Sequence, residues 1–241
     1  MHIQGATDTS VSAVQYEEQG GRSIRVYCQG ERDRHVHNLI YFVSSSKLEL
    51  GQDNITELVF NGKWEKGATL PVALKGSSLA VATYPTEGPR IRLYYQTDDL
   101  TIKEHCFETN HWSPGRCRVP LPLTLVAYFF CSTTGDFDGG KAPGCVPINA
   151  VGCPSNDSSQ SLYVFWSNTQ NEIVGKTLRQ DTWGPVDTVF GNLKPGTRFA
   201  VLRCDKGKEM KIFCQTADDS VEEISKDGDS WNGGSKIISV N

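Results

Sequence analysis

Short runs in which apolar and polar residues alternate recur along the chain, with turn-forming residues between them. A period of two residues is typical of β-strands, and no 3.6-residue period persists beyond two helical turns. Two such runs, IRLYYQ and IKEHCF, lie within a stretch that extends from Ile91 to Trp112. The pattern therefore predicts an all-β protein built from short strands.

The stretch Ile91–Trp112 is one copy of an internal repeat. It aligns without a gap with residues 162–183 and 210–231, and a fourth copy is split between Ile24–Gln29 and Ile55–Trp64. A short apolar run precedes every copy, and Gly- or Pro-rich residues follow its tryptophan. Each unit therefore predicts three or four short strands joined by turns, with the last strand after the tryptophan.

The tryptophans that end the copies are 48, 71 and 48 residues apart. A period near 48 with three or four strands per unit is typical of β-propeller blades, and a β-sandwich with accidental similarity is the alternative. We predict a single β-propeller domain over residues 1–241 with four to five blades, where the segment at 123–130 is either a degenerate fifth blade or only an insertion. Either the N-terminal residues or the C-terminal KIISV segment is expected to close the ring. The repeats are predicted at about 12–70, 77–117, 148–190 and 197–241, with insertions at about 30–54 and 118–145.

Comparison of the four copies position by position separates constant positions from variable ones. The tryptophan position is filled in all copies, by Trp64, Trp112, Trp183 and Trp231. The arginine position holds Arg25, Arg92, Tyr163 and Lys211. The glutamate position holds Glu57, Glu104, Gly175 and Glu223. A cation and an anion thus occur together in three copies and are both lost from the third, as expected of a ligand site that has decayed in one repeat.

These residue types suit the binding of a sugar. A guanidinium offers several hydrogen-bond donors to neighbouring hydroxyl groups, and a carboxylate accepts hydrogen bonds from two of them. An aromatic ring covers the apolar C–H face of a pyranose. The alternative is a structural ion pair on adjacent strands, which contributes little to stability where it is exposed.

The segments IRVYCQ, IRLYYQTDDLTIKEHCF and VEEISKDGDSW resemble the blades of the fungal fucose-specific lectin family, and the resemblance extends over most of residues 12–235. It implies a multivalent carbohydrate-binding protein that holds L-fucose between neighbouring blades, without catalysis, cofactor or metal. One blade would supply the Arg and the Glu, and the next blade an aromatic wall. Members of this family have six blades, which is more than the units found in this chain.

The resemblance assigns each pocket to the seam between two repeats. The first pocket is expected to contain Arg25, Glu57, Phe107 and Trp112. The second is expected to contain Arg92, Glu104 and Trp183, with Leu178 at the wall position that Phe107 has in the first. The fourth, across the ring closure, is expected to contain Lys211, Glu223, Phe60 and Trp64. The third repeat is expected to have lost its pocket, and the fourth pocket to be weak because lysine lacks the planar fork of arginine. Arg92→Ala is expected to remove binding at the second pocket and to leave folding intact.

Composition argues against several other functions. A net charge of −4 without a basic stripe argues against nucleic acid, and no apolar run is long enough to predict a membrane span. The eight cysteines form no CxxC pair, so no zinc site is expected. A disulfide between Cys131 and Cys145 is conceivable, but free thiols are favoured. The N-terminal residues lack a signal-peptide pattern, which predicts a cytoplasmic location or unconventional secretion.

Two other functions stay open at this point. A protein-interaction propeller would bind a partner through its rim and insertions, and its sugar sites would be vestigial. A glycoside hydrolase is suggested only by SKDGDSW at 225–231, which differs from a sialidase Asp box in the place of its glycine. A homodimer is possible with any of these functions.

Overall fold

The computed structural model describes residues 10–18, 21–29, 54–86, 88–108, 110–115, 137–153, 161–179, 182–204 and 209–238. These residues form seventeen β-strands and no helix, so the described part of the chain contains no helix that could span a membrane. The all-β prediction is confirmed. The predicted degenerate fifth blade at 123–130 lies outside the described residues.

The strands form four antiparallel sheets that follow one another in chain order. The first sheet contains β1 (Val11–Glu18), β2 (Gly21–Gln29), β3 (Asn54–Phe60) and β4 (Trp64–Val72). The second contains β5 (Ala80–Thr86), β6 (Gly88–Gln96), β7 (Ile102–Glu108) and β8 (His111–Pro114). The third contains β9 (Ile148–Cys153), β10 (Ser161–Ser167), β11 (Ile173–Arg179), β12 (Thr182–Trp183) and β13 (Asp187–Phe190). The fourth contains β14 (Phe199–Cys204), β15 (Glu209–Gln215), β16 (Val221–Asp227) and β17 (Ser230–Ile238).

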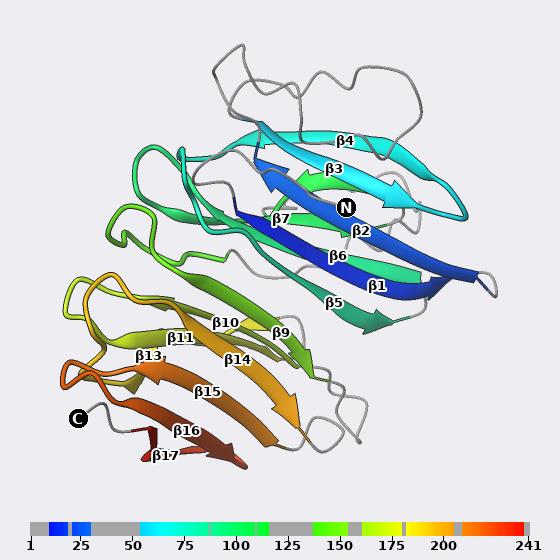
Figure 1. Cartoon of the computed structure of the whole chain (residues 1–241). Coiled ribbons are helices and arrows are strands. Elements are labelled where there is room, and N and C mark those ends of the chain that lie inside the picture. The colour runs from blue at the N-terminus through cyan, green and yellow to red at the C-terminus, as the bar shows by residue number, and fades with distance from the viewer. Residues whose placement is uncertain are drawn as a thin grey trace, which may run out of the picture.

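The first strand of every sheet faces the first strand of the next. Contacts join β1 to β5, β5 to β9, and β9 to β14, and Figure 1 shows the four sheets arranged one after another. The close approach of β9 to β5 requires Gly152, because a Cβ atom there would lie 2.3 Å from the carbonyl oxygen of Thr83. The first strands of the four sheets are β1, β5, β9 and β14, and their N-terminal ends surround a cavity of about 260 Å³. This arrangement is that of adjacent propeller blades around an axis.

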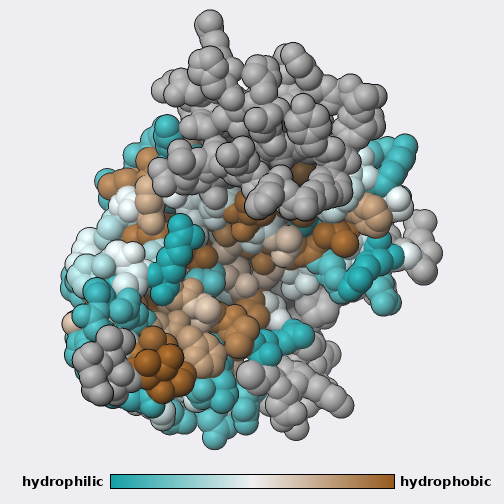
Figure 2. Space-filling view, in the orientation of Figure 1, coloured by the Kyte–Doolittle hydropathy of each residue, from teal (hydrophilic) through white to brown (hydrophobic). Residues whose placement is uncertain are grey.

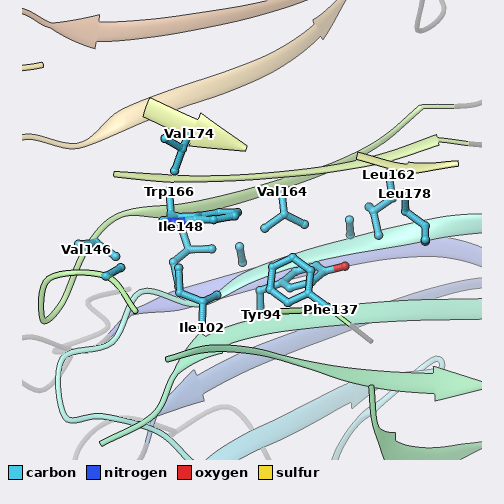
Figure 3. Packing of buried hydrophobic residues seen from close by; sticks show 13 residues of the cluster. Tyr94, Ile102, Phe137, Val146, Ile148, Leu162, Val164, Trp166, Val174 and Leu178 are labelled. Carbon is cyan, nitrogen blue, oxygen red and sulfur yellow. The ribbon is translucent and has the colours of Figure 1, made fainter. Parts of the chain in front are cut away.

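A hydrophobic cluster fills each of the three seams between neighbouring sheets. Tyr27 and Leu93 are fully buried in the first seam, between the first and second sheets. Leu162 and Val164 are fully buried in the second seam, whose cluster Figure 3 shows in detail, and Ile212 is fully buried in the third. In Figure 2, hydrophobic residues gather near the middle of the visible face, with hydrophilic residues around them. Because alternate residues of a strand point to opposite faces, each sheet contributes one set of side chains to each of its seams.

The first and fourth sheets lie at opposite ends of this arrangement (Figure 1). The residues Lys236–Ile238 of the KIISV segment belong to β17, which pairs with β16 of its own sheet, and β1 likewise pairs with β2. The described residues show no pairing between the first and the fourth sheets, and closure of the ring by one of these segments stays a prediction. On the outer strands of the fourth sheet, Leu202, Ile237 and Ile238 are 53%, 51% and 55% exposed.

Candidate functional site

The register of the strands places the arginine and the glutamate of a repeat on one face. In the first sheet Tyr27 lies opposite Glu57, and in the second sheet Tyr94 lies opposite Glu104. Each arginine precedes its tyrosine by two residues, so it points to the same side of the sheet and lies diagonally across from the glutamate. In both sheets that side faces the next sheet along the chain.

The first seam contains a buried ion pair. Arg25 Nη1 donates to Glu57 Oε1 at 2.6 Å, and the two side chains are 10% and 3% exposed. Arg25 Nε also donates to the hydroxyl of Tyr16 at 2.7 Å, and the hydroxyl of Tyr27 donates to Glu57 Oε1 at 3.2 Å. Burial alone would lower the pKa of Arg25, but its bonds to Glu57 and Tyr16 outweigh that effect and raise the pKa. The guanidinium is therefore charged and held in a fixed direction.

The second sheet supplies an aromatic wall to the same seam. The ring of Phe107 lies 4.0 Å from Cζ of Arg25. Trp112 Nε1 points to Glu57 Oε2 at 3.4 Å, and the indole meets the ring of Tyr27 edge-on at 5.8 Å. The structure thus brings together all four residues that the sequence assigns to the first pocket.

His105 supports this wall and makes it sensitive to acid. Its ring stacks on Trp112 at 5.6 Å, and burial together with nearby His111 lowers the pKa of His105 to about 4. The unfolded chain binds this proton near pH 6.5 and the folded chain only near pH 4, so acid favours the unfolded chain.

We expect the free energy of unfolding to fall by about 2–3 kcal/mol between pH 6.5 and 4 because of His105 alone. Urea denaturation of the wild type and of His105→Gln at both pH values measures this contribution. The variant, which cannot take up the proton, should lose less stability than the wild type on acidification. Equal losses in the two proteins would contradict the expectation.

The second seam contains an arginine, a glutamate and a tryptophan at the same repeat positions, more deeply buried, and Leu178 in place of Phe107. Arg92 is fully buried and forms ion pairs with Glu108 and, at 3.8 Å between Nε and Oε1, with Glu104. The hydroxyl of Tyr94 donates to Glu104 Oε1 at 2.7 Å. Burial raises the pKa of Glu104, although Arg92 and Tyr94 act in the opposite direction. Trp183 from the third sheet lies 6.3 Å from the ring of Tyr94. The structure therefore places Arg92, Glu104 and Trp183 in one seam, where Tyr94 links the ion pair to the tryptophan.

The two seams differ in how their polar atoms are satisfied. At the second seam Arg92 Nε, Glu104 Oε2 and Trp183 Nε1 are buried and have no hydrogen-bond partner. The corresponding atoms of the first seam are bonded: Arg25 Nε to Tyr16, and Glu57 Oε2 to Trp112 and, at 3.0 Å, to the amide nitrogen of Ala68. Buried polar atoms without partners are rare, so the second seam has unmet capacity for a ligand with hydroxyl groups.

The third seam is filled by aromatic rings. Tyr163 and Phe165 stack at 6.2 Å, and Phe165 meets Trp231 edge-on at 5.6 Å. A Cβ atom on Gly175 would lie 2.7 Å from the ring of Phe165, so the glycine is needed to make room for that ring. Lys226 occupies the place that Phe107 has in the first seam. The seam has neither the cation nor the anion of the other two at their repeat positions.

The structure does not assemble the predicted fourth pocket. Lys211 Nζ pairs with Glu223 Oε1 at 2.7 Å on the far face of the fourth sheet, where the side chains are 32% and 24% exposed. Phe60 and Trp64 pack against each other at 5.2 Å in the first sheet, at the opposite end of the molecule (Figure 1). The expectation depended on a ring closure between these sheets, which the described residues do not show.

The sequence comparison missed the tyrosines whose hydroxyl groups bond to the glutamates. Tyr27 and Tyr94 stand two residues after the arginines, and the other two copies have Phe165 and Phe213 at that position. The hydroxyl group is thus present only in the two copies that have both Arg and Glu, a signal that the same comparison contained. Phe137 of the second seam was also missed, because it lies in a predicted insertion with no counterpart to compare.

Among the residues whose side chains the structure describes, the cysteines are free thiols. Cys28, Cys106 and Cys214 are buried free thiols, Cys145 is an exposed one, and Cys131 lies outside the described residues. Within the ranges that the structure describes, no group of three His, Cys, Asp or Glu side chains could hold a metal ion.

Comparison with protein families gives one match that covers most of the chain. The model of the family described as "Fungal fucose-specific lectin" matches residues 47–209. The fucose-specific lectin of Aleuria aurantia is 38% identical over 196 residues, which are 76% of this chain and 52% of the relative. Fucose-specific lectin g276 of Arthrobotrys oligospora is 28% identical over 150 residues, 58% of this chain and 33% of the relative. The chain thus spans about half the length of the Aleuria aurantia lectin and about a third of that of lectin g276.

Solved structures of similar shape are propeller lectins. The crystal structure of AofleA from Arthrobotrys oligospora has a TM-score of 0.68 at 22% identity, over 98% of this chain and 58% of that one. The Aleuria aurantia lectin, described as a six-bladed β-propeller, has a TM-score of 0.59 at 19% identity, over 95% of this chain and 78% of that one. The prediction of a β-propeller fold is therefore confirmed.

Proposed function

Because the chain belongs to the fungal fucose-specific lectin family, we propose that it is a lectin that binds L-fucose-containing glycans, without catalysis, at the first seam. One observation carries the proposal: Arg25 and Glu57 of one sheet meet Phe107 and Trp112 of the next. The second seam repeats the arginine, the glutamate and the tryptophan, with Leu178 in place of Phe107, and the third has lost its cation and its anion together. Such loss as a unit is expected of groups that serve one ligand.

Each residue of the first seam has a role that its chemistry supports. Arg25 donates hydrogen bonds to sugar hydroxyls, and Glu57 accepts them. The rings of Phe107 and Trp112 lie against the apolar C–H face and the methyl group of the 6-deoxy sugar. The weakest contact in the seam is the one between Trp112 Nε1 and Glu57 Oε2, at 3.4 Å. A sugar hydroxyl replaces this contact at the least cost, because the bond between Arg25 and Glu57 can stay in place.

The competing function is that of a protein-interaction propeller whose ion pairs are structural. The burial of Arg25 and Glu57 favours it, since buried polar pairs also occur where no ligand binds. The two functions differ in what sugar does to the protein. A lectin holds the fucose end of a glycan and releases it to free L-fucose, and a protein-interaction propeller retains no glycan.

Fucosylated glycoproteins are the proposed partners. A single sugar site has modest affinity, and two or more sites on one particle raise the avidity for clustered glycans when the geometry permits simultaneous binding. A homodimer would provide two copies of the first seam. The net charge of −4 fits this choice of partner better than a nucleic acid.

Retention on an immobilised fucosylated glycoprotein tests the proposal. We expect free L-fucose to elute the protein, and D-galactose and D-mannose to leave it bound at the same concentration. A folded protein that is not retained would favour the protein-interaction propeller. Turnover of an aryl glycoside by the purified protein would point to a hydrolase instead.

A further inference from the structure

Phe137 occupies the second seam. The side chain is 7% exposed, and its ring lies 5.1 Å from Tyr94 and 4.8 Å from Trp183. Figure 3 shows this ring against that of Tyr94. The rings of Tyr94 and Trp183 both adjoin unpaired polar atoms of this seam. Tyr94 bonds to Glu104, whose Oε2 has no partner, and Trp183 carries the unpaired Nε1. Phe137 therefore fills the apolar side of the second candidate pocket.

The corresponding place in the first seam holds a much smaller residue. The side-chain amide of Gln96 bonds to the carbonyl oxygens of Ala142 and Pro143, as that of Gln29 does to Ala73 and Leu74. Gln96 Oε1 accepts from the amide nitrogen of Cys145, and Gln29 Oε1 from that of Gly76. The two connections between sheets thus correspond from Ala73 and Ala142 onward, and the same offset of 69 residues places Phe137 at the position of Ala68.

The polar atoms beside these two residues also differ. Beside Ala68, Trp112 Nε1 reaches Glu57 Oε2, and the amide nitrogen of Ala68 bonds to the same oxygen. Beside Phe137, Trp183 Nε1 and Glu104 Oε2 reach no partner. Arg92 is fully buried, whereas the side chain of Arg25 keeps 10% exposure. The second seam therefore keeps the arginine, the glutamate and the tryptophan of the first, with Leu178 in place of Phe107, and its Arg92 is closed to solvent. A cavity of about 500 Å³, lined in part by Glu104 and Phe137, borders it.

We propose that Phe137 is a plug that closes the second fucose pocket, so that a sugar reaches Arg92, Glu104 and Trp183 only after the ring has moved out. This proposal rests on the proposed function. The apparent affinity of the second pocket then equals its intrinsic affinity multiplied by the fraction of molecules in which the pocket is open. In its resting state the chain then offers the first seam alone.

The backbone after Phe137 is anchored on both sides. Lys176 Nζ donates to the carbonyl oxygen of Asp138 at 2.9 Å and lies 5.8 Å from the ring of Phe137. The amide nitrogen of Ile102 donates to the carbonyl oxygen of Gly140 at 3.2 Å. Removal of the Lys176 ammonium frees one anchor without removing a side chain from the core.

Titration with methyl α-L-fucoside in variants that carry Arg25→Ala tests the plug, because this change silences the first seam. We expect Arg25→Ala alone to bind methyl α-L-fucoside about 100-fold or more weakly than the wild type. Adding Phe137→Ala should open the second seam and raise the apparent affinity at least about 10-fold above that of the Arg25→Ala single variant. Adding Glu104→Gln as well should remove that site again. In the opposite direction, Ala68→Phe in the wild-type chain should abolish binding at the first seam.

The outcomes separate the two proposals. Wild-type binding that depends on Arg25, with no gain from Phe137→Ala, contradicts the plug and leaves the proposed function standing. A wild-type chain that already binds about two sugars contradicts the plug as well. No binding by the wild type or by Phe137→Ala contradicts the proposed function. Should Phe137→Ala not fold, Lys176→Met keeps the core intact, and a gain of about 2- to 5-fold supports the plug, whereas no gain counts against it.

Discussion

Arg25→Ala is expected to weaken the binding of methyl α-L-fucoside about 100-fold or more, since two charge-assisted hydrogen bonds contribute about 1.5–3 kcal/mol each. The guanidinium is held by Glu57 and Tyr16 and faces the wall of Phe107, so no neighbouring side chain can take its place. Isothermal titration calorimetry of the wild type and the variant gives the ratio of affinities directly.

Arg22→Ala is the matched control, because Arg22 lies on the same strand with an exposed side chain. It should bind like the wild type. The affinity of Arg25→Lys should lie between those of the wild type and of Arg25→Ala, since lysine keeps the charge but lacks the planar fork. Thermal unfolding of each variant separates a lost contact from a lost fold. A folded Arg25→Ala protein with wild-type affinity would remove Arg25 from the site.

The largest effect on stability is expected from Arg92→Ala. Arg92 is fully buried between Glu104 and Glu108, so its removal leaves Glu104 buried without a cation. Breaking such a pair costs about 3–5 kcal/mol, which urea denaturation measures as a shift of the midpoint. This burial revises the sequence-based expectation that Arg92→Ala leaves folding intact.

Two variants make this test specific. Arg90→Ala removes a half-buried arginine from the same strand and should change stability by no more than about 0.5 kcal/mol. The double change Arg92→Met with Glu104→Leu removes Arg92 and its more buried partner, and apolar replacement of a buried pair is often neutral. It leaves Glu108, whose side chain is 16% exposed and reaches water. It should therefore recover most of the loss. Wild-type stability in Arg92→Ala would show that the pair contributes nothing to the fold.

Much of the fold could be predicted because its signals are local and repeated. Alternating residues such as those of Ile91–Gln96 predict strands, and the recurrence of the same pattern four times predicts four equivalent sheets. The same alternation predicts that Arg25 and Glu57 share a face. Their position against Phe107 and Trp112 followed from the resemblance, and the structure brings the four residues together.

The rest depended on contacts that no repeat encodes. Phe137 follows a stretch without a counterpart in the other units, so nothing in its own sequence assigns it to the second seam. The packing of Tyr94 depends on Phe137 and on Trp183 of the third sheet, which are distant along the chain. The predicted fourth pocket required Lys211 and Glu223 to meet Phe60 and Trp64 of the first sheet. That meeting depends on ring closure, which is a property of the whole assembly rather than of one unit.

A crystal structure of the protein with methyl α-L-fucoside tests the central claim most directly. The account predicts a sugar in the first seam, with hydroxyl groups bonded to Arg25 and Glu57 and its apolar face against Trp112. It also predicts no sugar beside Arg92 while Phe137 keeps its present position. A sugar bound away from both seams, with the pair of Arg25 and Glu57 untouched, would contradict the account.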